Sequence, residues 1–384
     1  MTAAPAGLHA ARIFDGEHWH EDAVLLFDGP RLRDLRPATR GLPPGVLTLP
    51  PELTLAPGFV DTQVNGGGGV LLNDAPTPAA IATIAAAHRR FGTTALLPTL
   101  ITDRRDAVRA ALAATEAALA AGVPGVLGLH LEGPFINPAR RGVHPPDRIA
   151  RWEPGDLDLL ASPALRLVTL APECVPPEAI AALVRRGVRV SLGHSDATAA
   201  QVRAAVAQGL RGATHLFNAM SPLGSREPGA VGAVLDEPRI IAGIIADGHH
   251  VSDASLRIAL RCKGAAGLML VTDAMSTIGI SQQGFDLFGT PVTVVDGRPT
   301  TPDGTLAGSA LDMASAVRHA VSRLGATPAE ALAMAARTPA AFLGLDHELG
   351  TLRPGLRADI VALDAALHVR TTWIAGREPP AIAG

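Results

Sequence analysis

A few histidines and carboxylates, scattered along the chain, have side chains that could do chemistry together. Glu132, His194 and His215 offer one carboxylate and two imidazoles, a donor set that suits a catalytic zinc or similar divalent ion with one position left for water. Such an ion lowers the pKa of its water and polarises a carbonyl group. Asp273 could accept the proton of that water and return it to a departing amine. Each histidine alone could equally be a hydrogen-bonded core residue, so the elements that carry these residues matter.

The polar residues fall at or near the ends of short apolar runs, which alternate with Ala-rich stretches of helical periodicity. The predicted strands are 59–64, 95–100, 126–132, 165–171, 188–193, 213–216, 240–246 and 268–272. The predicted helices between them include 78–91, 105–121, 177–186, 199–208 and 252–262. Such repeats predict an α/β fold, a (β/α)8 TIM-like barrel, whose active site forms at the carboxyl ends of the strands. The coincidence of these residues at one barrel mouth favours an active site over separate core roles.

Both ends of the chain differ from the barrel. Short strand-like pieces at 9–14, 23–27 and 31–35 are broken by Gly and Pro, and residues 359–377 repeat this pattern. Helices are predicted at 311–324 and 328–343, between the barrel and the C-terminal pieces. We therefore predict a small β-sandwich domain built from residues 1–57 and 350–384, with the barrel, 58–349, inserted between them.

Composition argues against several classes of function. The chain has 384 residues, 47% of them hydrophobic, and its net charge of −3 provides no basic field for nucleic acid or an acidic membrane. Its two cysteines, Cys174 and Cys262, cannot form a disulfide framework or a cysteine-rich zinc site. We see no signal-peptide pattern in residues 1–20, and no apolar run approaches the roughly 20 residues that span a bilayer. We expect a cytoplasmic protein that binds neither nucleic acid nor membrane.

Longer motifs around the polar residues resemble one enzyme family. Two of these motifs, HLEGPF and THLFNAM, are together highly specific for that family. A third, RPGLRADIVALD, is less specific, because many amidohydrolases have a similar segment. The matching motifs are PGFVDTQVNGGGG (57–69), HLEGPF (130–135), RGVHPP (141–146), SLGHSDAT (191–198), THLFNAMSPLGSREPG (214–229), ADGHHV (246–251), VTDAM (271–275), GTLAGSALDM (304–313) and LGTLRPGLRADIVALD (349–364). The chain is thus similar, nearly end to end, to the N-acetylglucosamine-6-phosphate deacetylase family of the amidohydrolase superfamily. The resemblance implies hydrolysis of N-acetyl-D-glucosamine 6-phosphate to D-glucosamine 6-phosphate and acetate.

The resemblance also implies roles for individual residues. Asp273 matches the general base that then acts as acid, and His144 matches a histidine that helps to polarise the acetyl carbonyl. His250 matches a sugar-binding histidine, whereas its neighbour His249 stands where relatives often have an apolar residue. Arg226 matches an arginine that reaches the phosphate in the neighbouring subunit's site, which implies a homodimer. The implied substrate contacts are Val143, His144, Asn218, Ala219, Arg226, His250, Leu306, Ala307 and Gly308.

By the same resemblance, Glu132, His194 and His215 take the metal-ligand positions. Many amidohydrolases place two further histidines at the end of the first strand. Here those positions are Gln63 and Asn65, neutral amides that bind transition metals poorly. The sequence therefore resembles the single-metal branch, with one divalent ion per subunit. Zinc is the expected metal, with iron, manganese and cobalt as alternatives.

Three other functions are compatible with part of this pattern. Deacetylation of N-acetylgalactosamine 6-phosphate differs at a single hydroxyl centre, and the sequence separates the two sugars poorly. A cyclic amidase of the dihydroorotase type often uses a carboxylated lysine, but the one lysine, Lys263, lies at a predicted helix end. A catalytically inactive binding protein on the same fold would normally lack a metal ligand or Asp273, and all of these are present.

Overall fold

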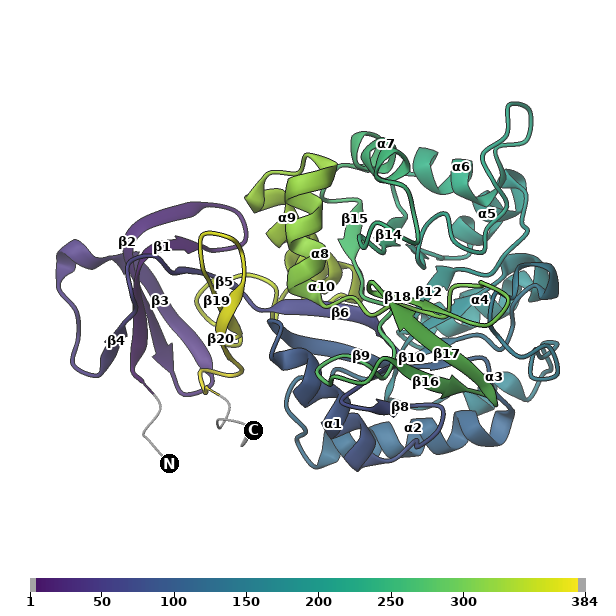
Figure 1. Cartoon of the computed structure of the whole chain (residues 1–384), viewed down its shortest axis with the longest axis horizontal. Helices are drawn as coiled ribbons and strands as arrows, with labels where there is room; N and C mark the ends of the chain where they lie inside the picture. Colours follow the sequence, from purple (N-terminus) through teal and green to yellow (C-terminus); the bar gives the residue numbers. More distant parts are fainter. Residues whose placement is uncertain (1–4, 379–384) are drawn as a thin grey trace.

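The computed structural model describes residues 5–378, which form a large barrel with a small β-domain beside it (Figure 1). The barrel sheet has eight parallel strands, and each pairs with the next one along the chain. These are β6 (Phe59–Val64), β9 (Thr93–Ile101), β10 (Leu129–Glu132), β11 (Leu165–Leu170), β12 (Arg189–Leu192), β13 (Gly212–Ala213), β14 (Ile241–Ile244) and β15 (Leu268–Leu270). The two edges meet where the backbone N–H of Asp273 donates to the carbonyl of Gln63 (3.0 Å) and that of Asn65 donates to the carbonyl of Ala274 (2.9 Å). The segment after β15 therefore closes the barrel against β6.

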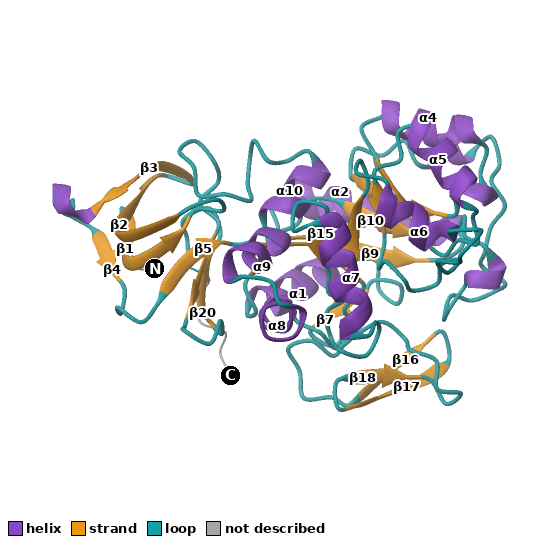
Figure 2. Ribbon diagram, turned by 90° about the horizontal axis from the view of Figure 1, so that it is seen from above, coloured by secondary structure: helices purple, strands orange, loops and turns teal. Residues whose placement is uncertain are grey.

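Helices surround the barrel strands (Figure 2). They are α1 (Pro78–Arg89), α2 (Arg105–Ala120), α3 (Asp156–Leu159), α4 (Pro177–Arg185), α5 (Ala199–Ala207), α6 (Gly229–Asp236), α7 (Asp253–Lys263), α8 (Met313–His319), α9 (Pro328–Ala335) and α10 (Arg337–Leu343). In α2, for example, Val108, Leu112 and Thr115 are buried on one face. Thr77 and Thr198 accept backbone hydrogen bonds that fix where α1 and α5 begin. Among residues 5–378, no helix has both the length and the apolar character needed to cross a membrane.

Strands from both ends of the chain form a second, seven-stranded sheet. It contains β1 (Gly7–Phe14), β2 (Trp19–Asp28), β3 (Arg31–Pro37), β4 (Val46–Thr48), β5 (Thr54–Pro57), β19 (Ile360–Leu363) and β20 (Val369–Trp373). β5 pairs with β1 on one side and β19 on the other, and Figure 1 shows the purple and yellow strands lying together. A separate core in this domain includes Leu8, Ile13, Leu25, Leu55 and Trp373. The predicted fold class, a barrel with a small β-domain built from both termini, is confirmed, and the domain limits stay a prediction.

One predicted helix, 328–343, is instead two helices, α9 and α10. Ala336 separates them with φ −132° and ψ −69°. Pro339 has no N–H to donate and would clash with the preceding turn in a helix interior. Because α10 begins at Arg337, Pro339 lies within its first turn, where a proline is tolerated. Similarly, the predicted helix 311–324 is α8 followed by a π-helical turn, Ala320–Leu324.

Two barrel strands end earlier than the sequence predicts. β13 ends at Ala213, so His215 lies beyond the strand, and β15 ends at Leu270, three residues before Asp273. Both functional residues have positive φ, 35° at His215 and 53° at Asp273. A non-glycine residue in this region cannot continue the extended backbone of a strand. The site therefore sits on turns that follow the strands.

A three-stranded antiparallel sheet after β15 has no counterpart among the predicted elements. It consists of β16 (Gly284–Leu287), β17 (Thr290–Val295) and β18 (Arg298–Thr300), and in Figure 2 it lies apart from the barrel strands. The turn from β17 to β18 is made by Asp296 and Gly297, with φ 52° and 76°. An Asp-Gly pair with both φ positive is typical of a tight hairpin turn.

Candidate metal centre and active site

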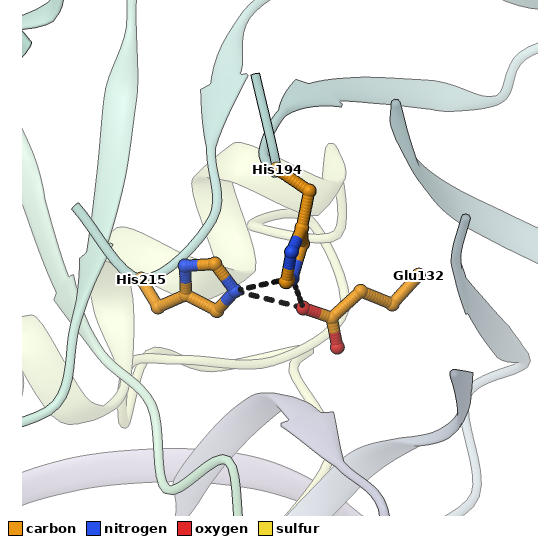
Figure 3. A group of neighbouring side chains, drawn as sticks. All are labelled: Glu132, His194 and His215. Atoms are coloured by element: carbon orange, nitrogen blue, oxygen red, sulfur yellow. Dashed lines mark hydrogen bonds and ion pairs between the residues drawn. The ribbon is translucent and has the colours of Figure 1, made fainter. Parts of the chain in front are cut away.

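Three buried side chains converge at the carboxyl ends of β10, β12 and β13 (Figure 3). The Oε1 atom of Glu132 lies 3.0 Å from Nε2 of His194 and 2.8 Å from Nε2 of His215. The two Nε2 atoms are 3.1 Å apart. These atoms belong to the three residues that the sequence analysis singled out, which form one group that could hold a metal ion.

The local backbone turns these side chains inward. Glu132 is the last residue of β10, and His194 follows β12 by two residues with φ 48°. Together with His215 and Asp273, His194 is held in the left-handed region, which is unfavourable for a side chain with a Cβ. Such conformations persist only where surrounding contacts enforce them, and they gather at functional sites.

The hydrogen bond that His194 makes fits a metal ion. His194 directs Nδ1 at the backbone carbonyl of Arg140, 2.9 Å away, so Nδ1 carries the proton and Nε2 has a free lone pair. That lone pair and the Glu132 carboxylate oxygen, 3.0 Å apart, are both acceptors. A divalent cation bound by both and by Nε2 of His215 would satisfy all three atoms, and this donor set is one that zinc prefers. Burial opposes ionisation of Glu132, but the contacts with His194 and His215 outweigh it and hold the pKa of this carboxyl well below its usual range.

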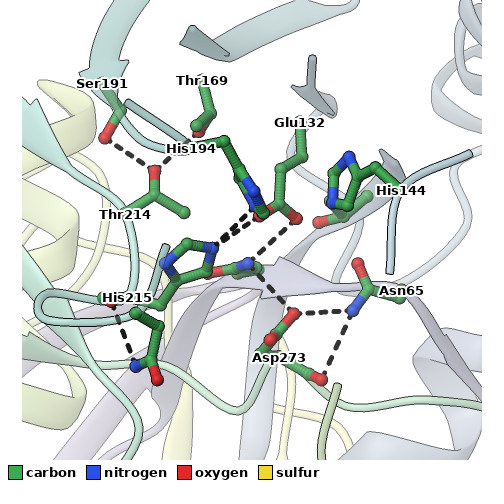
Figure 4. A network of polar contacts seen from close by, with 12 residues as sticks. Asn65, Glu132, His144, Thr169, Ser191, His194, Thr214, His215 and Asp273 are labelled. Atoms are coloured by element: carbon green, nitrogen blue, oxygen red, sulfur yellow. Dashed lines mark hydrogen bonds and ion pairs between the residues drawn. The ribbon is translucent and has the colours of Figure 1, made fainter. Parts of the chain in front are cut away.

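Asp273 is linked to this group through Gln63 and is also held by Asn65 (Figure 4). Its Oδ1 atom accepts hydrogen bonds from Gln63 Nε2 (3.0 Å) and Asn65 Nδ2 (2.7 Å). The same Gln63 nitrogen also donates to Oε2 of Glu132, 3.0 Å away. Burial, and after it the negative charge of Glu132, raise the pKa of Asp273 to about 6. A carboxyl with a pKa near neutrality can both accept and return a proton.

His144 lies against the metal group. Its ring centroid is 4.2 Å from that of His194, and its Nδ1 is 2.7 Å from the hydroxyl of Thr102. Burial is the main reason that the pKa of His144 is held well below its ordinary value. The imidazole is therefore neutral and carries one proton that it can donate.

The metal group and Asp273 line a cavity of about 340 Å³. Its other lining residues are Asn65, Ile101, Gly142, Val143, His144, Asn218, Ala219, Ile245, His250, Met275, Arg298, Gly304, Thr305, Leu306 and Gly308. Most of the predicted substrate contacts are thus brought together. Ala307 does not line the cavity, because its side chain is fully buried in a small core with Leu287 and Val292 of the hairpin sheet. Arg226 is exposed in the loop before α6 and does not line the cavity of its own chain either.

His250 is fixed by a carboxylate. Its Nδ1 lies 2.6 Å from Oδ2 of Asp247, while Oδ1 of Asp247 accepts the backbone N–H groups of His249 and His250 at 2.8 and 2.9 Å. This arrangement directs Nε2 of His250 away from Asp247. His249 instead directs Nε2 at the backbone carbonyl of Asp296, 3.1 Å away, in the hairpin sheet. The sequence analysis separated these two histidines, and the structure gives them different partners.

Sequence reasoning missed Arg298 and the roles of Gln63 and Asn65. Arg298 reaches the cavity because the hairpin sheet folds back to the barrel mouth, and the Asp-Gly turn before it is the signal that could have revealed the hairpin. The sequence indicates only that Gln63 and Asn65 bind transition metals poorly. In the structure they are hydrogen-bond donors that orient Asp273.

Comparison with known proteins gives a consistent result. The model of the amidohydrolase family matches residues 54–379. An N-acetylgalactosamine-6-phosphate deacetylase from Shewanella sp. (strain ANA-3) is 46% identical over 325 residues, 84% of this chain and 82% of the relative. The N-acetylglucosamine-6-phosphate deacetylase of Homo sapiens is 41% identical over 340 residues, with the same coverage of 84% and 82%. The crystal structure of N-acetylglucosamine-6-phosphate deacetylase from Pasteurella multocida has a TM-score of 0.93 at 33% identity and covers 97% of this chain and 99% of that one.

Proposed function

The chain belongs to the amidohydrolase family, and from this premise we propose that it hydrolyses the acetamide bond of an N-acetylhexosamine 6-phosphate to release acetate. The observation that carries the proposal is the buried Glu132, His194 and His215 group beside Asp273 in one cavity. N-acetylglucosamine 6-phosphate is the first candidate substrate, because relatives and solved structures that resemble this chain are named as deacetylases of that sugar phosphate. N-acetylgalactosamine 6-phosphate is the second, because the Shewanella relative at 46% identity bears that name.

We assign the metal to Glu132, His194 and His215. A divalent ion held there would polarise the acetyl carbonyl and lower the pKa of the attacking water. Zinc is the proposed metal, because two imidazoles and one carboxylate with an open position form a donor set typical of catalytic zinc. A homodimer and a cytoplasmic location stay predictions from the sequence.

We assign the proton transfers to Asp273. Its carboxylate takes a proton from the attacking water and, as the C–N bond breaks, returns it to the amine nitrogen. Gln63 and Asn65 hold Oδ1, which leaves Oδ2 for this exchange. The Thr102 hydroxyl, 2.7 Å from Nδ1 of His144, holds the ring in place, and in the tautomer with the proton on Nε2 the neutral imidazole would donate to the acetyl carbonyl oxygen.

Acetate release tests the proposed function directly. The purified enzyme, supplied with zinc, is expected to release acetate from N-acetylglucosamine 6-phosphate or N-acetylgalactosamine 6-phosphate, and much more slowly from unphosphorylated N-acetylglucosamine. The ratio of kcat/KM between the two phosphorylated sugars assigns the preferred hexosamine. Absence of acetate from all three substrates, with metal bound, would contradict the function.

The second prediction concerns Arg226, which we propose acts on the phosphate bound to a partner subunit. Arg226→Ala should lower kcat/KM for the phosphorylated substrate by about 10- to 150-fold, because a hydrogen bond to a charged group contributes about 1.5–3 kcal/mol. Arg109→Ala on the exposed side of α2 is the matched control and should have no effect. Mixing Arg226→Ala with Asp273→Asn protein should restore some activity, since one site of each hybrid dimer then has both intact residues. No restoration, in mixtures that native mass spectrometry shows to contain hybrids, would mean that Arg226 does not act across subunits.

A further inference from the structure

Among the described residues that line the cavity, Arg298 is the one arginine or lysine. It is the first residue of β18 and belongs to the hairpin sheet, which lies apart from the barrel strands in Figure 2. Its side chain is exposed, and none of the side-chain hydrogen bonds and ion pairs found within residues 5–378 involves its guanidinium. A cation that faces a substrate cavity without a protein partner is free to bind an anionic group of the substrate.

Two sets of contacts hold the backbone of Arg298 at the cavity mouth. On one side, Nε2 of His249 lies 3.1 Å from the carbonyl of Asp296, two residues before Arg298 and in the tight turn that leads to it. On the other side, the N–H of Ala307 donates to the carbonyl of Pro299 (3.2 Å), and Thr300 bridges to Leu306. β18 is therefore attached both to the loop that carries His250 and to the loop 304–308, and both of these loops line the cavity.

The chemistry of the substrate indicates which anion meets Arg298. The acetamide on C2 must reach the metal group and Asp273 at the floor of the cavity, where Glu132 and Asp273 place carboxylates. C6 is on the other side of the pyranose ring, so its phosphate points toward the mouth. A dianion there is repelled by the carboxylates of the floor and attracted by a guanidinium at the rim, which can bind two phosphate oxygens at once.

We propose that Arg298 binds the 6-phosphate of the substrate within its own subunit, and that His249 positions it through the hairpin turn. This inference rests on the proposed function. It adds a cation from the same chain to the one that Arg226 would supply from a partner. It also gives His249, which does not line the cavity, a positioning role.

The ratio of kcat/KM for the phosphorylated sugar to kcat/KM for unphosphorylated N-acetylglucosamine is the decisive measurement. Arg298→Ala is expected to lower this ratio by about 10- to 150-fold, mainly through KM, because the removed contact is a charge-assisted hydrogen bond. Arg298→Lys should recover part of the loss, since it keeps the charge without the paired geometry. Arg109→Ala is again the matched control. Inorganic phosphate should inhibit the wild type competitively and the Arg298→Ala variant much more weakly.

Further variants separate binding from positioning and one subunit from two. His249→Ala should reproduce a smaller part of the rise in KM with little change in kcat, and His249→Gln, which keeps an N–H donor, should reverse it. Mixing Arg298→Ala with Asp273→Asn protein should restore no activity, in contrast to the Arg226 mixture, because both residues serve the same site. An active wild type whose substrate ratio survives Arg298→Ala would overturn this inference alone. A wild type that releases no acetate would overturn the proposed function and the inference with it.

Discussion

Replacing Asp273 with asparagine is expected to lower kcat for acetate release by about 10²–10⁴-fold, the contribution usual for general acid–base catalysis. The amide cannot take the proton of water at neutral pH or return it to the amine. The fold should survive, because the atom that Gln63 and Asn65 contact is Oδ1, and asparagine keeps an oxygen there. Only Oδ2, to which no described side chain donates a hydrogen bond, becomes an NH2 group.

Steady-state kinetics and metal analysis of the same preparation would test this prediction. Bound metal should stay at the wild-type level, since Asp273 is not among the three proposed ligands. Asp158→Asn is the matched control. This carboxylate is 89% exposed on the short helix α3, so its replacement should leave kcat unchanged. A variant of Asp273 that kept more than about a tenth of wild-type kcat would move the proton transfers to another residue.

Replacing Glu132 with glutamine is expected to remove the metal, and acetate release with it. A neutral amide is a poor ligand for a transition metal. The NH2 group of the new glutamine would also face one of two sides. On one side is the Gln63 amide, which donates a hydrogen bond to Glu132 in the wild type, and on the other are the two histidines. Changes in residues that merely orient metal ligands reduce affinity by about 10–100-fold, so loss of a ligand should reduce it more. Partial recovery of activity at high zinc concentration would be the corresponding signature.

Elemental analysis provides the measurement. The wild type should hold about one divalent ion per chain, and Glu132→Gln less than about a tenth of that after dialysis. Glu153→Gln is the control, since this carboxylate is 66% exposed and does not line the cavity. Full metal content in the Glu132 variant would exclude the proposed ligand set. Two ions at full occupancy in the wild type would contradict a single-metal site.

The barrel could be predicted because its strands are buried on both faces. β15, for example, has all of its residues buried and is a continuous apolar run in the sequence. The hairpin sheet could not be recognised from apolar runs, because β17 alternates between buried and exposed residues, as strands with one solvent-facing side do. Arg298 was missed with it. The break between α9 and α10 was missed because helical periodicity continues across it, and only Pro339 signals the interruption.

The metal ligands of the candidate site could be predicted from the sequence, but the hydrogen bonds between its residues could not. Two histidines and a carboxylate at strand ends indicate a metal site by their chemistry alone. Gln63 donates hydrogen bonds to Glu132, 69 positions further along the chain, and to Asp273, 210 positions further along. Both bonds depend on how the barrel closes. No local pattern contains that information. The residue types at 63 and 65 therefore suggested what the site lacks, while the folded chain shows what they contribute.

The pairing of β5 with β19 has a consequence for the order in which the protein can assemble during its synthesis. β5 ends at Pro57 and its partner begins at Ile360, so some 300 residues are made between the two strands. A ribosome that adds about 5–20 residues per second needs roughly 15–60 s for that stretch. Throughout this time one edge of the N-terminal strands has open backbone groups, and such edges are where chains pair wrongly with one another. The barrel, whose strands each pair with the next one along the chain, can form progressively, whereas the small domain is completed only when the C-terminal strands have left the ribosome.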